Sequence, residues 1–209
     1  MLADGAADFQ THIDVSRETL DRLAAYEALI KKWNPAINLV ARSTLESIWQ
    51  RHFLDSADVF QVAGVASGHW LDMGTGGGFP GAVVGILAAE LAPDLKVTCI
   101  ESDIRKCEFL RTVARTTGVQ IGILSRRIEE TPPQNADVVS ARALTSVLKL
   151  LEYADRHLAK DGQALFQKGE KWQQEIEEAR ESWAFALETY PSSTNAASAI
   201  LKIRDIKRV

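Results

Sequence analysis

The sequence predicts an α/β fold built on a doubly wound, mainly parallel sheet, and three features support this class. From residue 68 onward, short apolar runs alternate with segments of helical periodicity, which is the pattern of repeated strand–helix units. The first apolar run leads directly into a turn rich in glycine. Two further apolar segments near the end of the chain are typical of an antiparallel hairpin that completes such a sheet.

The segment before the sheet has helical signals and no strand signal. A helix is expected over residues 16–33, where apolar residues recur at helical spacing. Trp33-Asn34-Pro35 is expected to break it, because proline lacks a backbone N–H. Ser43 and Glu46 form a capping box that predicts a second helix, from Leu45 to about Phe60.

The core alternates strands and helices. Strands are expected at 68–73, 96–101, 119–124, 136–140 and 163–167. Helices are expected from near Pro80, at 103–117, at 146–158 and at 170–182. Asp161-Gly162 is expected to turn the chain into the fifth strand, and the closing hairpin is expected to pair 184–190 with 199–209.

Length and composition indicate a single globular domain. The chain has 209 residues, of which 46% are hydrophobic and 25% charged, values typical of a soluble globular protein. We expect residues 1–66 to form a helical cap packed on a core of residues 67–209, as one compact unit.

Composition also excludes several classes of protein. No apolar run approaches the roughly 20 residues of a membrane span, and the N-terminus lacks the features of a signal peptide. A formal charge of −4 argues against a general nucleic-acid coat but leaves room for a local basic patch. Cys99 and Cys107, the only cysteines, are expected to be buried thiols. We therefore expect a cytoplasmic protein with no metal and no membrane association.

The glycine-rich turn predicts a cofactor that contains adenosine. Asp72 ends the first strand, and Gly74, Gly76 and Gly78 follow at alternate positions. Such glycines let the backbone approach a ligand between a strand and a helix. The order Asp-x-Gly-x-Gly-x-Gly is the pattern of enzymes that use S-adenosylmethionine (SAM). Because a Gly-x-Gly-x-x-Gly also runs from Gly76 to Gly81, a nicotinamide cofactor is the alternative.

Other candidate residues follow the ends of the next strands, where ligands lie in an open α/β sheet. Glu101 ends the second strand and could accept hydrogen bonds from both ribose hydroxyls of an adenosine. Ile128 and Glu129 follow the third strand, where the adenine would lie. Arg142 ends the fourth strand, and its alternative role is a salt bridge with a neighbouring acid.

The substrate atom is expected to be nucleophilic already. The fourth strand lacks the Asn/Asp-Pro-Pro-aromatic motif of many exocyclic-amine methyltransferases, and no cysteine is placed to attack a pyrimidine. Guanine N7 fits, because its lone pair needs no deprotonation and positioning supplies the catalysis. Cationic donors such as Arg142, Arg127 or Lys168 could hold the neighbouring O6. By periodicity alone, His52 would be a buried histidine bonded to backbone. For Arg126-Arg127 a solvated face is the alternative to a role in the site.

Six segments together resemble the bacterial small-subunit ribosomal RNA methyltransferase G family, also called glucose-inhibited division protein B. In family order they are Trp33-Asn34-x-x-Ile37-Asn38-Leu39, Arg51-His52-x-Leu54-Asp55-Ser56, Asp72-x-Gly74-Thr75-Gly76-x-Gly78-x-Pro80-Gly81, Ser125-Arg126-Arg127-Ile128-Glu129-Glu130, Ser140-Ala141-Arg142-Ala143 and Lys168-Gly169. They span about residues 30 to 170. The resemblance implies a Rossmann-like class I SAM-dependent methyltransferase fold.

The resemblance also implies a reaction and a site. The reaction is SAM-dependent methylation of guanine N7 in 16S rRNA of the small ribosomal subunit, at nucleotide 527 in the 530 loop. SAM would be bound by Gly74, Phe79, Ile128, Glu129 and Arg142, with Glu101 a further candidate for the ribose, and the glycine pattern adds Gly76 and Gly78 to the cofactor site. With Arg142, the catalytic residues on the RNA side would be Asn38, His52, Arg127 and Lys168. The family usually has a single Ser-Arg where this chain has Arg126-Arg127, so the arginine that carries the role stays open, and we favour Arg127.

Three alternatives to this function remain. A SAM-dependent enzyme could act on a different RNA, a protein or a small molecule. A nicotinamide-dependent oxidoreductase would bind NADH, and a non-catalytic RNA-binding module would tolerate loss of Gly76 and Gly78. We expect a monomer. The basic end of the hairpin, at Lys202, Arg204, Lys207 and Arg208, could contact phosphate or form a solvated strand face.

Overall fold

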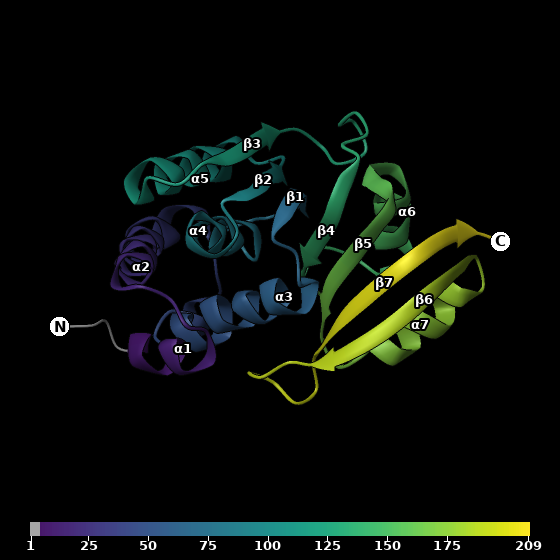
Figure 1. Ribbon diagram of the computed structural model, residues 1–209, viewed down its shortest axis with the longest axis horizontal. Helices are drawn as coiled ribbons and strands as arrows, with labels where there is room; N and C mark the ends of the chain where they lie inside the picture. Colours follow the sequence, from purple (N-terminus) through teal and green to yellow (C-terminus); the bar gives the residue numbers. More distant parts are fainter. Residues whose placement is uncertain (1–4) are drawn as a thin grey trace.

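A seven-stranded sheet forms the centre of the computed structural model, which describes residues 5–209. The strand order is β3-β2-β1-β4-β5-β7-β6 (Figure 1). The strands are β1 (Ser67–Met73), β2 (Asp94–Glu101), β3 (Ile121–Ser125), β4 (Ala136–Arg142), β5 (Leu158–Lys168), β6 (Trp183–Pro191) and β7 (Ala199–Arg208). Strands β1 to β5 pair in parallel, and β7 is antiparallel to both β5 and β6. The doubly wound fold and its closing hairpin are confirmed.

Helices cover both faces of the sheet (Figure 1). On one face lie α1 (Ala6–His12), α2 (Arg17–Ile37), α3 (Asp55–Ala63), α4 (Gly81–Leu91) and α5 (Ile104–Thr117), and on the other lie α6 (Val147–His157) and α7 (Trp172–Arg180). Neighbouring residues of a strand belong to the hydrophobic cores on opposite faces of the sheet. Trp70 lies in the core under α1 to α5, and Leu71 lies in the core under α6 and α7. Because both faces are buried, the central strands read as continuous apolar runs.

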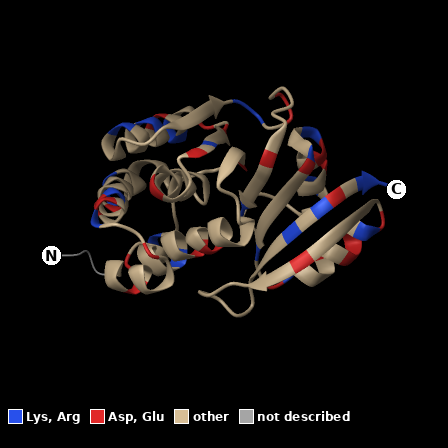
Figure 2. Ribbon diagram, in the orientation of Figure 1, with Lys and Arg blue, Asp and Glu red and all other residues tan. Residues whose placement is uncertain are grey.

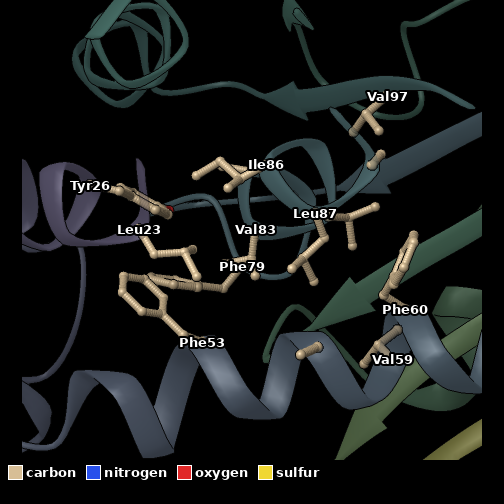
Figure 3. Close-up of a cluster of buried hydrophobic side chains, with 14 of the residues drawn as sticks. Leu23, Tyr26, Phe53, Val59, Phe60, Phe79, Val83, Ile86, Leu87 and Val97 are labelled. Atoms are coloured by element: carbon tan, nitrogen blue, oxygen red, sulfur yellow. The ribbon is translucent and has the colours of Figure 1, made fainter. Parts of the chain in front are cut away.

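The N-terminal helices are anchored to the glycine-rich turn by an aromatic cluster (Figure 3). The Tyr26 ring stacks on Phe53 and Phe79, with ring centres 5.4 and 5.6 Å away. Its hydroxyl donates a hydrogen bond to the Gly77 carbonyl, and the side chain is fully buried. Packing of α2 against the core therefore also fixes the backbone of the turn.

The expected break at Trp33-Asn34-Pro35 is wrong, since α2 continues through Pro35 to Ile37. The helix ends through Asn34 instead. The Asn34 side-chain oxygen accepts hydrogen bonds from the backbone N–H groups of Leu39 and Val40, at 2.7 and 2.9 Å. Asn38 adopts the left-handed conformation of a helix C-cap, with φ +47°. A buried amide, which periodicity cannot detect, sets the boundary.

The expected helix from Leu45 to Phe60 is also wrong in its first half. Arg42–Thr44 forms a 3₁₀ turn, Trp49–Leu54 a π-helical segment, and α3 begins only at Asp55. In this segment Trp49 and Phe53 pack edge-on, with ring centres 5.1 Å apart, and both side chains are buried. Ser43 of the expected capping box lies inside the 3₁₀ turn, so it does not cap an α-helix.

The expected turn at Asp161-Gly162 lies inside a strand. Strand β5 runs through it, and a register shift relative to β4 between Ala136 and Val138 accommodates the extra residues. The irregularity is a bulge. The other core elements match their expected ranges to within a few residues. Within residues 5–209, no helix is long and apolar enough to cross a membrane.

Candidate active site

Two cavities open at the carboxyl ends of the parallel strands and share Arg142 and Ala143. The first, of about 430 Å³, we call the glycine-side cavity. It is lined by Leu39, Gly74–Gly77, Phe79, Ile100–Ser102, Lys106, Arg126–Glu129, Leu144 and Tyr153, besides the shared pair. The second, of about 590 Å³, we call the hairpin-side cavity. It is lined by Thr44, Arg51, His52, Asp55, Gln167–Lys171, Glu175 and residues of the loop between β6 and β7.

The glycines of the turn have two different tasks. Gly76, at φ +58°, lines the glycine-side cavity, and a Cβ built there would meet no atom closer than 3.9 Å. Gly78, at φ +98°, does not line the cavity. A Cβ there would collide with the Tyr26 hydroxyl and come within 2.8 Å of the Ala82 Cβ. The first position keeps space open beside the backbone, and the second allows the turn to pack.

The acid before the glycines braces the turn. The Asp72 side chain is fully buried and accepts hydrogen bonds from the Gly81 N–H at 3.0 Å and the Ser140 hydroxyl at 2.7 Å. Burial raises the pKa of Asp72 to about 6, against the opposing effect of these hydrogen bonds. Asp72 thus connects β1, β4 and the start of α4, and these contacts stabilise the turn that lines the cavity.

The other predicted cofactor residues lie around the same cavity. Glu101, 8% exposed, accepts hydrogen bonds from the backbone N–H groups of Gly76 at 2.9 Å and Asp103 at 2.8 Å. Ile128 and Glu129 also line this cavity. The carbonyl of Ile128 bonds the ring of His157 at 3.0 Å, which ties the cavity wall to the end of α6. The structure brings these residues together as expected, apart from Gly78.

Arg142 lies where the two cavities meet. Its guanidinium donates to His52 Nδ1 at 2.7 Å, lies 3.5 Å from the Asp55 carboxylate and stacks 4.8 Å from the centre of the Phe79 ring. Burial lowers the pKa of Arg142, and the Asp55 carboxylate opposes that shift. The alternative of a salt bridge with an acid is therefore also realised. Arg142 combines a fixed position with access to both cavities.

His52 is a neutral acceptor for that arginine. Since Arg142 donates to Nδ1, the ring proton sits on Nε2 and is donated to the Thr44 hydroxyl at 2.8 Å. Burial lowers the pKa of His52 to about 3, and the charges of Arg142 and Arg51 add to the shift. The expectation from periodicity of a histidine bonded to backbone is wrong, because both ring nitrogens bond side chains.

The remaining predicted residues are less uniformly placed. Lys168 lines the hairpin-side cavity, where its ammonium pairs with Glu175 at 2.7 Å and donates to the Thr145 carbonyl at 2.8 Å. Arg127 and Arg126 are both exposed and both line the glycine-side cavity. Asn38 is exposed at the end of α2 and lines neither cavity. The structure does not bring it to the site.

Sequence reasoning did not select several residues that line the cavities. Tyr153, on α6, lines the glycine-side cavity, and Asp55, Gln167, Ser192 and Thr194 line the hairpin-side cavity. Tyr153 carried no motif, and the loop residues become part of the site only through folding. Asp55 lies within the Arg-His-x-Leu-Asp-Ser segment and could have been found there.

The basic end of the hairpin is largely engaged by the protein itself. Basic bands run along β7 beside acidic bands (Figure 2). Lys202 donates to the Val62 carbonyl at 3.0 Å, Arg204 pairs with Glu188, and Arg208 lies 5.8 Å from the centre of the Trp183 ring. These contacts favour the strand-face interpretation. Residues 5–209 contain no group of three or more metal-ligating side chains.

Comparisons with known proteins agree with this architecture. The family model for rRNA small subunit methyltransferase G matches residues 19–201. A relative from Ruegeria sp. (strain TM1040), named ribosomal RNA small subunit methyltransferase G, is 49% identical over 208 residues, 100% of both chains. A solved methyltransferase from Geobacter sulfurreducens superposes with a TM-score of 0.57 at 14% identity, covering 96% of this chain and 94% of that chain.

A second solved structure supports the same fold. TYW2 from M. jannaschii, determined in complex with AdoMet, superposes with a TM-score of 0.56 at 12% identity, covering 84% of this chain and 80% of that chain. At these identities the two structures bear on the fold alone. The family assignment rests on the sequence matches.

Proposed function

The chain belongs to the rRNA small subunit methyltransferase G family, and we propose that it transfers the methyl group of SAM to N7 of a guanine in 16S rRNA. The observation that carries the proposal is the position of Arg142 at the junction of two cavities. Group transfer needs donor and acceptor to meet in line, and a wall residue common to both cavities marks that meeting place.

The glycine-side cavity fits the cofactor. Its volume of about 430 Å³ lies in the range of small-molecule sites. Gly76 leaves space for a ligand beside the backbone, and the buried Glu101 carboxylate offers acceptors for hydroxyl groups. We propose that Gly74, Gly76, Phe79, Glu101, Ile128, Glu129 and Arg142 hold SAM, and that Gly78 contributes by packing the turn.

SAM supplies an electrophilic methyl group on a sulfonium. Guanine N7 would accept this methyl with its existing lone pair as the carbon–sulfur bond breaks and the sulfonium becomes a neutral thioether, so no side chain needs to remove a proton. Arg142 keeps an Nε–H without a protein acceptor among residues 5–209, and guanine O6 is an acceptor beside N7. We propose that Arg142 orients the base through O6, while neutral His52 fixes the guanidinium without adding a second positive charge.

The hairpin-side cavity is proposed to receive the target base. RNA-modifying enzymes reach a base by taking it out of its stack, and a concave site of about 590 Å³ has room for one. Lys168 and Arg127 are proposed to contact RNA at the two cavities. Asn38 lies outside both, so a role for it would require an RNA that extends over α2.

Family membership decides between the classes of protein considered from the sequence. It favours a methyltransferase over a nicotinamide-dependent oxidoreductase or a non-catalytic RNA-binding module. We propose further that the enzyme acts as a cytoplasmic monomer on the assembled small subunit, at nucleotide 527 of the 530 loop. The helical segment up to residue 66 is proposed to fold as one unit with the core, and residues 1–4 of the expected cap lie outside the described residues.

A transfer assay tests the substrate class. Purified protein and SAM labelled in the methyl group are incubated with small ribosomal subunits from a strain lacking this gene, with naked 16S rRNA and with large subunits. The proposal expects label in the RNA of the small subunits. Label in protein, or no label although calorimetry shows SAM binding, would point to a SAM-dependent enzyme for a different RNA, a protein or a small molecule.

A further inference from the structure

Asp55 joins two parts of the site that are far apart in the sequence. One carboxylate oxygen accepts a hydrogen bond from the Gln167 amide at 2.7 Å and lies 3.5 Å from the Arg142 guanidinium. The other accepts from the hydroxyls of Ser192 at 3.1 Å and Thr194 at 3.2 Å. The side chain is 15% exposed. One carboxylate therefore contacts strands β4 and β5 on one side and the loop between β6 and β7 on the other.

That loop, residues 192–198, which we call the hairpin loop, is fastened to the segment around Asp55 at successive positions. Besides the two hydroxyl bonds to Asp55, the Ser193 hydroxyl donates to Asp58 at 2.5 Å. Arg51 donates to the Thr194 carbonyl at 3.2 Å. Ser192, Thr194 and Asn195 line the hairpin-side cavity. The position of this cavity wall is thus set by contacts to the start of α3.

Asp55 is also the counter-charge of Arg142. Among residues 5–209 it is the carboxylate that forms an ion pair with this guanidinium, and Lys168 has a separate partner in Glu175. A largely buried guanidinium needs such a partner, because an uncompensated buried charge is strongly destabilising. The Asp55 carboxylate therefore helps hold Arg142 against His52 and Phe79.

We propose that Asp55 is a positioning residue that links the wall of the substrate cavity to Arg142. When a base enters the hairpin-side cavity against the hairpin loop, the same carboxylate that holds the loop holds the guanidinium facing the cofactor. This inference rests on the proposed function. It assigns a role to a residue of the cavity wall that acts through the Arg142 guanidinium.

The test replaces Asp55 by Asn, which keeps the size of the side chain but removes its charge. The Asn amide nitrogen is a donor and replaces a carboxylate oxygen that accepts hydrogen bonds. At that position a donor would therefore face the donor groups of its neighbours. If Arg142 is displaced by about 1 Å, kcat for methyl transfer to small subunits falls about 100-fold. Asp58→Asn is the matched control: it loosens Ser193 but makes no contact with Arg142, so its kcat stays within about twofold of wild type.

A double-mutant cycle separates positioning from general damage. If Asp55 acts through the guanidinium, adding Asp55→Asn to Arg142→Lys lowers the single-turnover rate less than about threefold further. A merely structural role would instead multiply the two losses. A second full loss of about 100-fold in the Arg142→Lys background would overturn the proposal.

A variant of the hairpin loop keeps the proposal testable if Asp55→Asn fails to fold. Ser192→Ala combined with Thr194→Val removes both hydroxyl bonds to Asp55 and leaves its contact with Arg142. We expect KM for small subunits to rise about tenfold, while the SAM dissociation constant stays within about threefold because neither residue lines the glycine-side cavity. An unchanged KM contradicts the link. Absence of methyl transfer by the wild-type protein would contradict the proposed function instead, which distinguishes the two failures.

Discussion

Gly76 and Gly78 are predicted to fail in different ways when each is replaced by Ala, although both belong to one motif. Both adopt positive φ, so a Cβ at either position adds about 1–2 kcal/mol of strain. At Gly76 the added methyl meets open space beside the glycine-side cavity. At Gly78 it meets the buried Tyr26 hydroxyl and the Ala82 side chain. The first change therefore affects the ligand and the second the fold.

The magnitudes follow from these surroundings. Gly78→Ala adds overpacking of about 1–3 kcal/mol to the strain, for a total loss of about 2–5 kcal/mol in the free energy of unfolding. For a chain of this length each kcal/mol lowers Tm by about 2–4 °C, so we expect a fall of roughly 4–20 °C. Gly76→Ala lowers the free energy of unfolding only by the backbone strain. The added methyl occupies the ligand space, however, and weakens SAM binding about 10- to 100-fold.

Thermal melting with and without SAM, together with calorimetric titration of SAM, measures both quantities in the same samples. Gly76→Ala should melt within about 8 °C of wild type and bind SAM weakly. Gly78→Ala should melt at a lower temperature and bind SAM, while still folded, with a smaller loss. The reasoning is refuted if Gly78→Ala keeps the wild-type Tm and loses SAM binding, or if Gly76→Ala binds SAM normally.

Three further predictions concern side chains around the site. Glu101→Gln keeps an acceptor for the Gly76 N–H but removes the charge, so SAM binding should weaken about tenfold by calorimetry; unchanged affinity would exclude a contact with the cofactor. Tyr26→Phe removes the bond to the buried Gly77 carbonyl and should cost about 1–3 kcal/mol in urea unfolding, whereas no loss would show that the turn does not depend on it. Because the pKa of His52 is lowered to about 3, its neutral form contributes stability that is complete above pH 6.5 and is lost as the pH falls from 6.5 toward 3, by up to about 1.4 kcal/mol per pH unit. His52→Asn should therefore melt with a weaker dependence on pH below 6.5 than wild type, and parallel curves would contradict this assignment.

The order of strands and helices could be predicted because the central strands are buried on both faces. Their apolar runs, and the helical periodicity between them, survive in the sequence as local patterns. The errors came where particular side-chain contacts, rather than periodicity, accompany the local structure. Asn34 ends α2 through a buried side-chain amide, and the π-helical segment contains the buried, packed pair Trp49 and Phe53. Hydrophobic periodicity does not distinguish these arrangements from a regular helix.

The same distinction applies to the candidate site, where some residues could be predicted from the sequence and others could not. Residues at strand ends, such as Glu101 and Arg142, could be placed from topology, because parallel strands bring their carboxyl ends to one edge. The two tasks within the glycine motif could not be separated, since only the fold puts Tyr26 against Gly78. The role proposed for Asp55 depends on contacts with Ser192, which lies more than a hundred residues away in the chain.

Identification of the methylated nucleoside tests the central claim most directly. Small subunits from a strain lacking this gene are labelled with SAM and the purified enzyme, the 16S rRNA is digested, and the labelled nucleoside and its position are determined by mass spectrometry. The account predicts 7-methylguanosine at a single position, with the label strongly reduced by Arg142→Lys. Label in another nucleoside, or in 7-methylguanosine at an undiminished rate when Arg142 is replaced, would contradict it.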